Sequence, residues 1–390
     1  MTRVVVFGCG PRGERIAEAY ALHPEASVAA VYDADLARRD CMAEAFGCEA
    51  LPGLDWEHIS ELDRPLIGVI ATRTALHGPL TLMALHYGST IFDALVVEKP
   101  LASTPAQLSA IRLASQRYNI PVFTQHQFCC VPPIATAKRL LADGIIGNHR
   151  YTEVSGKGYS AGYDTLNLGT HLLVAAQQFS YTTPQSVAAS FRQSDGNLTR
   201  VHDIRHGPYG FGLIAGDHIE ATVTGLPMRL NFKQLDAPTA ANIRVDLCGD
   251  AGTLRVYWKN ALHWRRSEDD PWEPQPLDNP TLFDYDYNTY PNGDLWHADA
   301  TIRAVTSRAR HPADLDKESA ALHIIWAAAR SHFEKEGEHA EVLWDANRFD
   351  LHPLAAAARR AHFDPDRMDA ALRYPEWVSR HPWASWTARA

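Results

Sequence analysis

The sequence predicts an α/β protein in which a doubly wound parallel sheet precedes a second domain of mainly antiparallel strands. The chain has 390 residues, and at about 150 residues per domain this length suggests two domains. In the first third, compact apolar strands alternate with helical stretches, which is typical of a parallel sheet covered on both faces. We place the first domain at residues 1–125, the second at 126–345, and a C-terminal helical and extended tail at 346–390.

Five short runs rich in Val, Ile or Leu predict the strands of the first sheet. They cover residues 3–7, 27–32, 66–71, 94–97 and 122–124. The helical patterns between them cover residues 14–21, 36–46, 80–87 and 105–118. Near-continuous apolar strands of this kind are buried on both faces of a sheet, so helices are expected on either side.

The second domain has a different sequence pattern. Its strand-like runs contain β-branched or aromatic residues and are separated by turn residues. The runs cover residues 151–154, 186–191, 219–224, 229–233, 244–247 and 253–257. In the third run the apolar side chains share one face, as a half-exposed antiparallel strand requires. Helices are expected afterwards over residues 297–306 and 320–333.

Composition argues against several classes of protein. The 37 Lys and Arg against 46 Asp and Glu give a net charge of −9, so no nucleic-acid partner is expected. No apolar run approaches the roughly 18 residues that a membrane span needs. The six cysteines include no Cys-x-x-Cys pair and suggest no disulfide framework, which favours a reduced, cytoplasmic setting.

A glycine motif, Gly8-Cys9-Gly10-Pro11-Arg12-Gly13, directly follows the first strand and opens a helix. In that context the glycines let the backbone turn tightly and approach a pyrophosphate, while the helix N-terminus offers free N–H groups. The alternative is a glycine-rich turn that holds no ligand.

The second strand ends at Asp33, twenty residues after Gly13. A carboxylate at this place accepts hydrogen bonds from the ribose hydroxyls and repels a 2′-phosphate, which favours NAD over NADP. The alternative is that Asp33 caps the helix that starts near Asp35. Arg38 and Arg39 lie nearby in sequence and leave NADP possible.

Two further segments suggest catalytic chemistry. Glu98-Lys99-Pro100 ends a strand at the edge where open α/β sheets bind ligands, and Lys99 can donate to a substrate hydroxyl there. Asn167 and His171 are spaced as i and i+4 of a helix, and an imidazole titrates near neutrality. The alternatives are a surface lysine paired with Glu98 and a structural histidine.

Together these motifs resemble the Gfo/Idh/MocA family, named for glucose–fructose oxidoreductase, inositol dehydrogenase and a rhizopine catabolism protein. The matching positions are Gly8, Gly10 and Gly13 of the dinucleotide loop, His77, Glu98-Lys99-Pro100, and the turn at 249–254. The resemblance covers roughly residues 1–335 and implies an N-terminal Rossmann domain with a C-terminal α/β domain. It further implies that Pro100 supports Lys99, and that the second domain's open, mainly antiparallel sheet joins subunits in a homodimer or homotetramer.

The chain departs from the family pattern in three places. Asn167 stands where the family usually has an acid, so it can orient a substrate or His171 but cannot serve as a base. Val174 stands where the family often has Asp, and the segment before Glu98 is longer than usual.

These observations predict an NAD(P)-dependent enzyme that oxidises a secondary alcohol of a sugar, cyclitol or glycoside, or reduces the ketone. His171 would take the hydroxyl proton, Lys99 would stabilise the oxygen, and Asn167 would orient the substrate. The sequence leaves open the alternative that Lys99, rather than His171, carries the proton. The residues expected to contact the cofactor are Gly8, Gly10, Pro11, Arg12, Gly13, Asp33, Thr72, His77, Glu98 and Lys99. Those expected to contact the substrate are Lys99, Tyr159, Tyr163, Asp164, Asn167, His171 and Trp296.

Two other functions stay open at this point. One is a glycoside-cleaving enzyme in which bound NAD is reduced and reoxidised within each turnover. The other is a non-catalytic protein that senses NAD or a sugar. No metal site is expected, because His202 and His206 lie in a loop with no third ligand evident.

Overall fold

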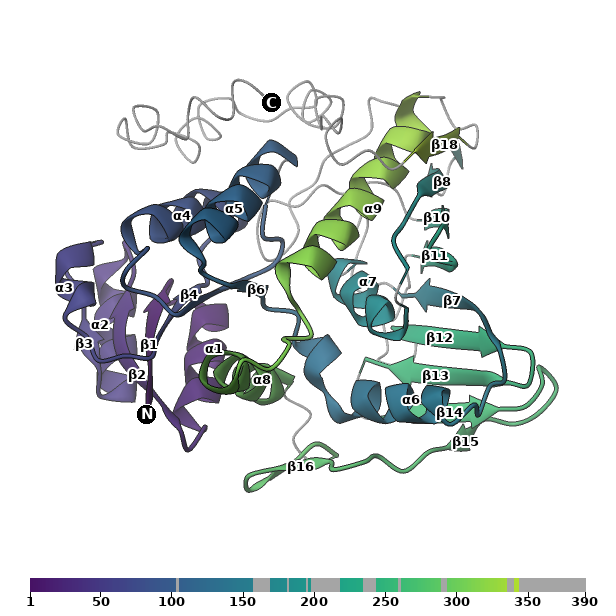
Figure 1. Ribbon diagram of the computed structural model, residues 1–390, viewed down its shortest axis with the longest axis horizontal. Helices are drawn as coiled ribbons and strands as arrows, with labels where there is room; N and C mark the ends of the chain where they lie inside the picture. The colour runs from purple at the N-terminus through teal and green to yellow at the C-terminus, as the bar shows by residue number, and fades with distance from the viewer. Residues whose placement is uncertain are drawn as a thin grey trace. The chain divides into compact units, whose positions relative to one another are not determined.

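The structure, a computed structural model, describes ten segments of the chain (Figure 1). They are residues 1–102, 105–156, 169–180, 182–193, 196–197, 218–233, 243–258, 261–288, 293–334 and 340–343. These segments form two compact units, the first from residues 1–127 and 293–318, the second from 128–288 and 319–343. The expected tail at 346–390 lies outside the described residues. Among the residues described, no helix is long and apolar enough to cross a membrane.

The first unit contains a six-stranded parallel sheet in the order β3-β2-β1-β4-β5-β6. Its strands are β1 (Thr2–Phe7), β2 (Ala26–Tyr32), β3 (Glu49–Ala50), β4 (Leu66–Ile70), β5 (Ala94–Val97) and β6 (Val122–Thr124). The helices between them are α1 (Pro11–Ala21), α2 (Leu36–Phe46), α3 (Trp56–Ser60), α4 (Thr74–Tyr87) and α5 (Pro105–Tyr118). The prediction of a doubly wound parallel sheet is confirmed. The strand order reverses between β1 and β4, and ligands of such sheets bind where this happens.

Local sequence explains where these helices begin and end. Helix α1 has Pro11 at its first position, where a missing N–H costs nothing. Helix α2 begins after Asp35, whose carboxylate accepts hydrogen bonds from the first-turn N–H groups, and it ends at Gly47 in the left-handed conformation, with φ 60°. Helix α4 starts at Thr74, six residues before the predicted residue 80, and it contains Pro79.

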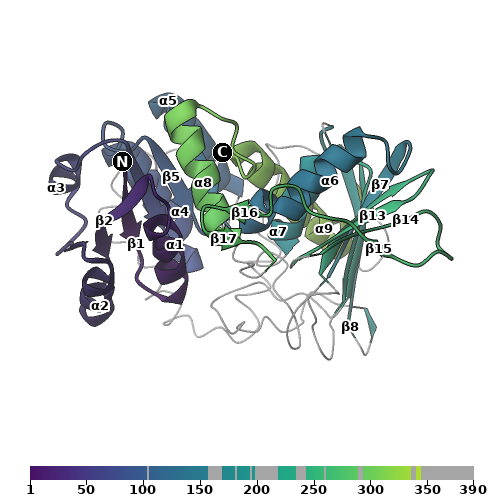
Figure 2. The same cartoon turned by 90° about the horizontal axis from the view of Figure 1, so that it is seen from below.

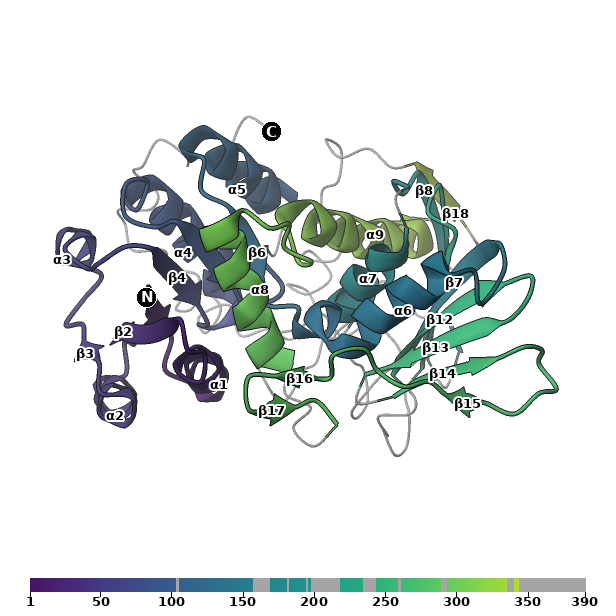
Figure 3. The same ribbon diagram turned by 60° about the horizontal axis from the view of Figure 1, so that its bottom comes forward.

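Helix α8 (Gly293–Ser307) and the start of α9 (Leu315–Glu334) belong to the first unit, although they follow the second unit's strands in sequence. Ala298 and Ile302 of α8 pack into the same core as Ile16 and Tyr20 of α1, so the two helices lie side by side (Figure 3). This packing places the beginning of α8 close to the glycine motif.

The second unit contains a ten-stranded sheet in the order β15-β14-β13-β12-β7-β11-β10-β8-β18, with β9 paired to β8. All pairs are antiparallel except β11 with β7, which confirms the predicted mainly antiparallel sheet. The strands are β7 (His149–Ser155), β8 (Ser186–Gln193), β9 (Gly196–Asn197), β10 (His218–Thr224), β11 (Met228–Lys233), β12 (Arg244–Gly249), β13 (Thr253–Tyr257), β14 (Leu262–Arg265), β15 (Glu273–Pro274) and β18 (Ala340–Leu343). A separate two-stranded sheet pairs β16 (Thr281–Leu282) with β17 (Tyr285–Asp286).

One face of the large sheet is apolar and covered. Val154, Val245, Leu254 and Val256 are buried on that face. Helices α6 (Pro132–Ala142) and α7 (Thr170–Ala176) pack against its central strands (Figure 2). Several alternating positions, such as Tyr151, Arg255 and Tyr257, are polar or aromatic and partly exposed, which is the pattern of an antiparallel sheet with one solvated face.

Candidate functional site

The glycine motif forms a tight turn between β1 and α1 that leaves space in front of the helix. Gly8 has a φ of 108°, and a Cβ there would lie 2.5 Å from the carbonyl oxygen of Ala71. A Cβ on Gly13 would overlap the carbonyl group of Gly8. At Gly10, by contrast, a Cβ would meet no heavy atom within 4 Å. Gly8 and Gly13 are therefore required by the turn itself, whereas Gly10 keeps open a space that the helix N-terminus faces.

Asp33 holds this turn from the end of β2. Its Oδ2 accepts a hydrogen bond from the backbone N–H of Cys9 at 2.7 Å, and its Oδ1 accepts one from Asp35 at 2.8 Å. The alternative role as the cap of α2 is wrong, because Asp35 fills that position. Burial, and then the negative charge of Asp33, raises the pKa of the Cys9 thiol to about 12, so that thiol stays protonated.

His77 connects the end of β4 to the segment that follows Glu98. Its Nδ1 lies 2.9 Å from the carbonyl oxygen of Pro100, and its Nε2 lies 3.0 Å from that of Thr72. Burial lowers the pKa of His77, and a neutral ring donates to one carbonyl at a time. The Oγ1 of Thr72 is buried without a hydrogen-bond partner among the described residues. This orphaned hydroxyl lies beside the glycine turn, since the Thr72 backbone approaches Gly8.

Arg12 joins three elements through two buried carboxylates. Its Nε donates to Glu98 at 2.5 Å, and its two terminal nitrogens donate to Asp294 of α8 at 2.8 and 2.6 Å. Gln125 donates a further hydrogen bond to Asp294 at 3.0 Å. Burial by itself would raise the pKa values of Glu98 and Asp294, but the charge and hydrogen bonds of Arg12, together with Lys99 at Glu98 and Gln125 at Asp294, hold both below their usual range. The guanidinium therefore braces the glycine turn against the end of β5.

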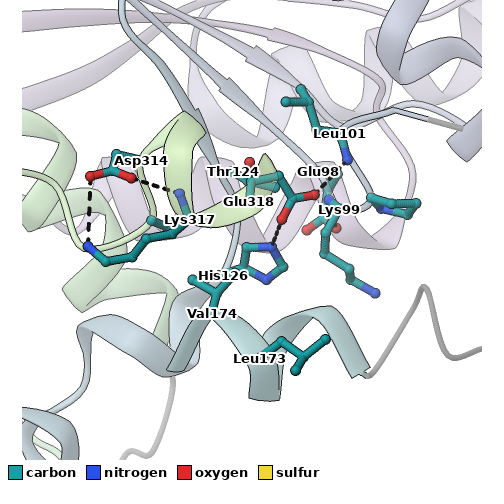
Figure 4. A network of polar contacts seen from close by, with 12 residues as sticks. Glu98, Lys99, Leu101, Thr124, His126, Leu173, Val174, Asp314, Lys317 and Glu318 are labelled. Atoms are coloured by element: carbon teal, nitrogen blue, oxygen red, sulfur yellow. Dashed lines mark hydrogen bonds and ion pairs between the residues drawn. The ribbon is translucent and has the colours of Figure 1, made fainter. Parts of the chain in front are cut away.

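Lys99 extends from a short segment that is anchored on both sides (Figure 4). Its own N–H donates to the Glu98 carboxylate at 3.1 Å. The next carbonyl, that of Pro100, contacts His77, and the N–H of Leu101 donates to Glu318 at 3.1 Å. Lys99 itself is half-buried. The lysine therefore stands at the carboxyl edge of the sheet with little freedom in its backbone.

His171 lies in the second unit, in helix α7. Its side chain is buried, and its ring meets that of Trp258 edge to face at 5.1 Å. Helix α7 begins at Thr170, and Asn167 lies outside the described residues, as do Tyr159, Tyr163 and Asp164. Trp296 is buried in α8 of the first unit. The combined action of His171 and Lys99 stays a prediction.

Sequence reasoning missed three residues of this site: Asp294, Gln125 and Glu318. Asp294 lies 282 positions from Arg12, and Glu318 lies 217 positions from Leu101. Both carboxylates occupy first turns of helices, where acidic residues are common for local reasons. No local pattern distinguishes them from ordinary surface acids.

Comparison with known proteins shows which family the first unit resembles. Residues 2–126 match the model of the Gfo/Idh/MocA oxidoreductase family, described as an NAD-binding Rossmann fold. D-apiose dehydrogenase from Paraburkholderia graminis is 29% identical over 203 residues, which are 47% of this chain and 52% of that protein. A dTDP-3,4-didehydro-2,6-dideoxy-alpha-D-glucose 3-reductase from Streptomyces antibioticus is 31% identical over 138 residues, 35% of this chain and 40% of that protein. The chain spans about half the length of these curated relatives.

Solved structures share the fold over a longer stretch. A putative myo-inositol dehydrogenase from Sinorhizobium meliloti matches with a TM-score of 0.66 at 19% identity, over 88% of this chain and 99% of that one. A 3-ketoreductase from Actinomadura kijaniata, solved with NADP, matches with a TM-score of 0.63 at 20% identity, over 84% and 96%. Identities this low establish the architecture of both units and nothing further.

Proposed function

We propose, from the match of residues 2–126 to the Gfo/Idh/MocA oxidoreductase family, that the protein transfers a hydride between NAD and a sugar-like substrate. The substrate class is a secondary alcohol, or the matching ketone, of a sugar, cyclitol or glycoside. One observation carries the proposal: the open glycine turn and the anchored Lys99 lie at the same edge of one parallel sheet.

The residues present fit a dinucleotide. A Cβ at Gly10 would meet no heavy atom within 4 Å, so a pyrophosphate can approach the N–H groups of α1 there, and the Thr72 hydroxyl has no partner among the residues described. Asp33 keeps acceptor capacity for ribose hydroxyls beyond the two N–H groups that it already holds.

Nearby arginines do little to favour a 2′-phosphate. Arg39 donates to Asp40 and to the carbonyl oxygen of Leu51, and Arg38 pairs with Asp35 on the surface. With Asp33 repelling a further anion, this arrangement favours NAD over NADP.

In the proposed mechanism the chain supplies orientation and charge, whereas the nicotinamide, when bound, supplies the redox step. The Lys99 ammonium donates to the reacting oxygen and stabilises the negative charge that develops there as the C–H bond breaks. A ring nitrogen of His171 accepts the hydroxyl proton and returns it in the reverse reaction. Asn167 orients a neighbouring hydroxyl. The relatives named above act on sugars by their names, which supports a sugar as substrate.

The first experiment follows nicotinamide absorbance with NAD or NADP against panels of cyclitols, free hexoses, pentoses and nucleotide sugars. We expect reduction of NAD with one of these classes, and a drop of at least about a hundredfold in kcat for Lys99→Ala and for His171→Ala. Lys138→Ala, a change of an exposed lysine on α6, is the matched control and should behave as the wild type.

Other outcomes of that experiment redirect the proposal. Tight NAD binding without net reduction, together with cleavage of a glycoside, would indicate a redox cycle confined to the bound cofactor. NAD binding with no turnover of any substrate would indicate a sensor. In the sensor case His171→Ala would leave the binding of any partner intact.

We also propose that the solvated face of the ten-stranded sheet joins two copies of the chain in a homodimer or homotetramer. This face presents Tyr151, Arg229, Arg255 and Tyr257, with the Arg229 guanidinium 4.2 Å from the Tyr151 ring centre. Arginine and aromatic side chains are enriched in subunit interfaces. Light scattering on the intact protein should give a mass above one chain, and Arg229→Glu should lower it.

A further inference from the structure

We propose that Glu318, through its buried hydrogen bonds to Leu101 and His126, is a positioning residue that fixes the segment carrying Lys99. The inference rests on the role of Lys99 in the proposed function. It concerns residues that no motif identifies, from a helix far along the chain.

Backbone contacts with strand β6 hold the first turn of α9, which carries Glu318. The residues just before α9 pair with the edge strand β6, through an antiparallel bridge between Phe123 and Asp314 and a hydrogen bond from Thr124 to Ala313 at 3.1 Å. Asp314 then accepts the N–H of Lys317 at 3.0 Å and its backbone carbonyl accepts the N–H of Glu318. The first turn of α9 is therefore registered against the sheet, and Glu318 is registered with it.

The two carboxylate oxygens of Glu318 hold two different strand ends. Oε1 accepts the N–H of Leu101, which follows β5, at 3.1 Å, and Oε2 lies 2.5 Å from Nε2 of His126, which follows β6. Figure 4 shows Glu318 between these two groups, with the Lys99 side chain extending from the same segment. Glu318 and His126 are both fully buried. Because this carboxylate is buried away from water, its negative charge is stabilised by these two donors.

This contact completes the anchoring of the Lys99 backbone. The preceding residue, Glu98, is tied to Arg12, and the following carbonyl, that of Pro100, contacts His77. Glu318 then holds the N–H of Leu101, two residues after Lys99. Because a shift of about 1 Å in a reacting group can lower a rate about a hundredfold, loss of this anchor should act on catalysis more than on cofactor binding.

The experiment compares two variants of Glu318 with two of a matched carboxylate. Glu318→Gln keeps an oxygen that accepts the Leu101 N–H, whereas Glu318→Leu keeps the volume and removes every acceptor. The control is Asp299, a buried carboxylate of the same unit that lies 3.5 Å from His23 and pairs with Arg303, changed to Asn and to Leu. For each protein, kcat, the NAD dissociation constant and the thermal midpoint are measured.

We expect Glu318→Leu to lower kcat by about a hundredfold while the NAD dissociation constant changes by less than about threefold. Glu318→Gln should recover most of the lost kcat. Asp299→Leu should lower the thermal midpoint about as much as Glu318→Leu does, but it should leave kcat per folded molecule near the wild-type value. Equal kcat values for Glu318→Leu and Asp299→Leu would overturn the proposal.

A second measurement keeps this inference separate from the proposed function. Reductive methylation of the intact protein with formaldehyde and cyanoborohydride, followed by peptide mass spectrometry, gives the reaction rate of the Lys99 amine, with Lys138 as internal reference. We expect Glu318→Leu, but not Glu318→Gln, to change the rate at Lys99 severalfold. If the wild type reduces no substrate, the proposed function fails, and the methylation rates still decide on Glu318. An unchanged rate in Glu318→Leu would refute the positioning role.

Discussion

Among the described residues, Arg12 and Arg255 each bind a buried aspartate with two nitrogens, and the contrast between them separates a candidate site from a structural contact. Arg12 binds Asp294 with two nitrogens and Glu98 with a third, so it joins the start of α1, the end of β5 and the start of α8. Arg255 also binds Asp246 with two nitrogens, but the two residues are direct neighbours on paired strands β13 and β12. The Arg255 guanidinium then stacks on Trp272 at 3.9 Å.

The difference lies in what each arginine holds in place. Arg255 stabilises a strand pair that backbone hydrogen bonds already define, so its loss is a local event. The partners of Arg12 have no backbone ladder in common, and the ion pairs themselves set the relation between the glycine turn and Lys99. Preorganised charge such as that of Arg12 and its two carboxylates is what a catalytic site at the edge of the sheet requires.

The largest effect is expected from Asp294→Leu. Among the described residues, removing this carboxylate leaves Arg12 paired with Glu98 alone and takes away the acceptor of the Gln125 amide N–H. This should cost about 3–5 kcal/mol of the free energy of unfolding. The NAD dissociation constant should rise as well, since the turn loses its brace. Urea denaturation and NAD titration provide the measurements. Asp246→Leu is the control, and an equal loss of NAD affinity in that variant would remove the contrast.

The glycine turn offers the next test, because substitution of Gly13 should lower stability whereas substitution of Gly10 should weaken NAD binding. Gly13→Ala forces a Cβ onto the Gly8 carbonyl and should lower the free energy of unfolding by about 2–3 kcal/mol. Gly10→Ala meets no protein atom, so it should leave stability nearly unchanged and weaken NAD binding at least tenfold, by about 1.4 kcal/mol. Thermal denaturation and NAD titration separate the two. Unchanged NAD affinity in Gly10→Ala would show that the space does not hold the pyrophosphate.

The buried His297, which lies near Asp294 and Arg12, should make the free energy of unfolding depend on pH. Burial lowers the pKa of His297 from 6.5 to about 4, so the folded protein resists a proton that the unfolded chain accepts. Stability is then complete above pH 6.5 and falls as the pH drops toward the folded value of about 4. Between pH 7 and pH 5 this single group should remove about 2 kcal/mol.

His297→Gln is the matching variant, since its amide still donates to the carbonyl oxygen of Thr124, which His297 Nε2 contacts at 2.9 Å. The difference in unfolding free energy between wild type and variant should shrink by that amount from pH 7 to pH 5. A difference that does not change with pH would contradict the assignment.

The smallest effect is expected on the sheet of the second unit. Trp272→Ala removes the ring on which Arg255 and Arg265 stack, at 3.9 and 4.5 Å, and should cost about 1 kcal/mol. NAD binding should not change. Urea denaturation measures the loss, and a loss as large as that of Asp294→Leu would mean that the two arginines are energetically alike.

The sequence by itself determined the repeating strands and helices, the glycine turn and the position of Lys99 at a strand end. These features depend on local patterns: apolar runs for buried strands, glycine where a Cβ has no room, and proline at the start of α1. The same local logic left Asp33 ambiguous between a helix cap and a ribose ligand. Only the fold showed that its carboxylate holds Cys9, while Asp35 caps the helix.

Tertiary structure alone decided which distant groups complete the edge that carries Lys99. Helix α8 and the first turn of α9 return to the first unit after the strands of the second, and they bring Asp294 to Arg12 and Glu318 to Leu101. Long-range pairing of this kind produces no pattern in the sequence, because an acidic residue in the first turn of a helix looks the same in the sequence whether it is buried or exposed. Its identity as an anchor follows from burial and from the donors that face it, and packing determines both.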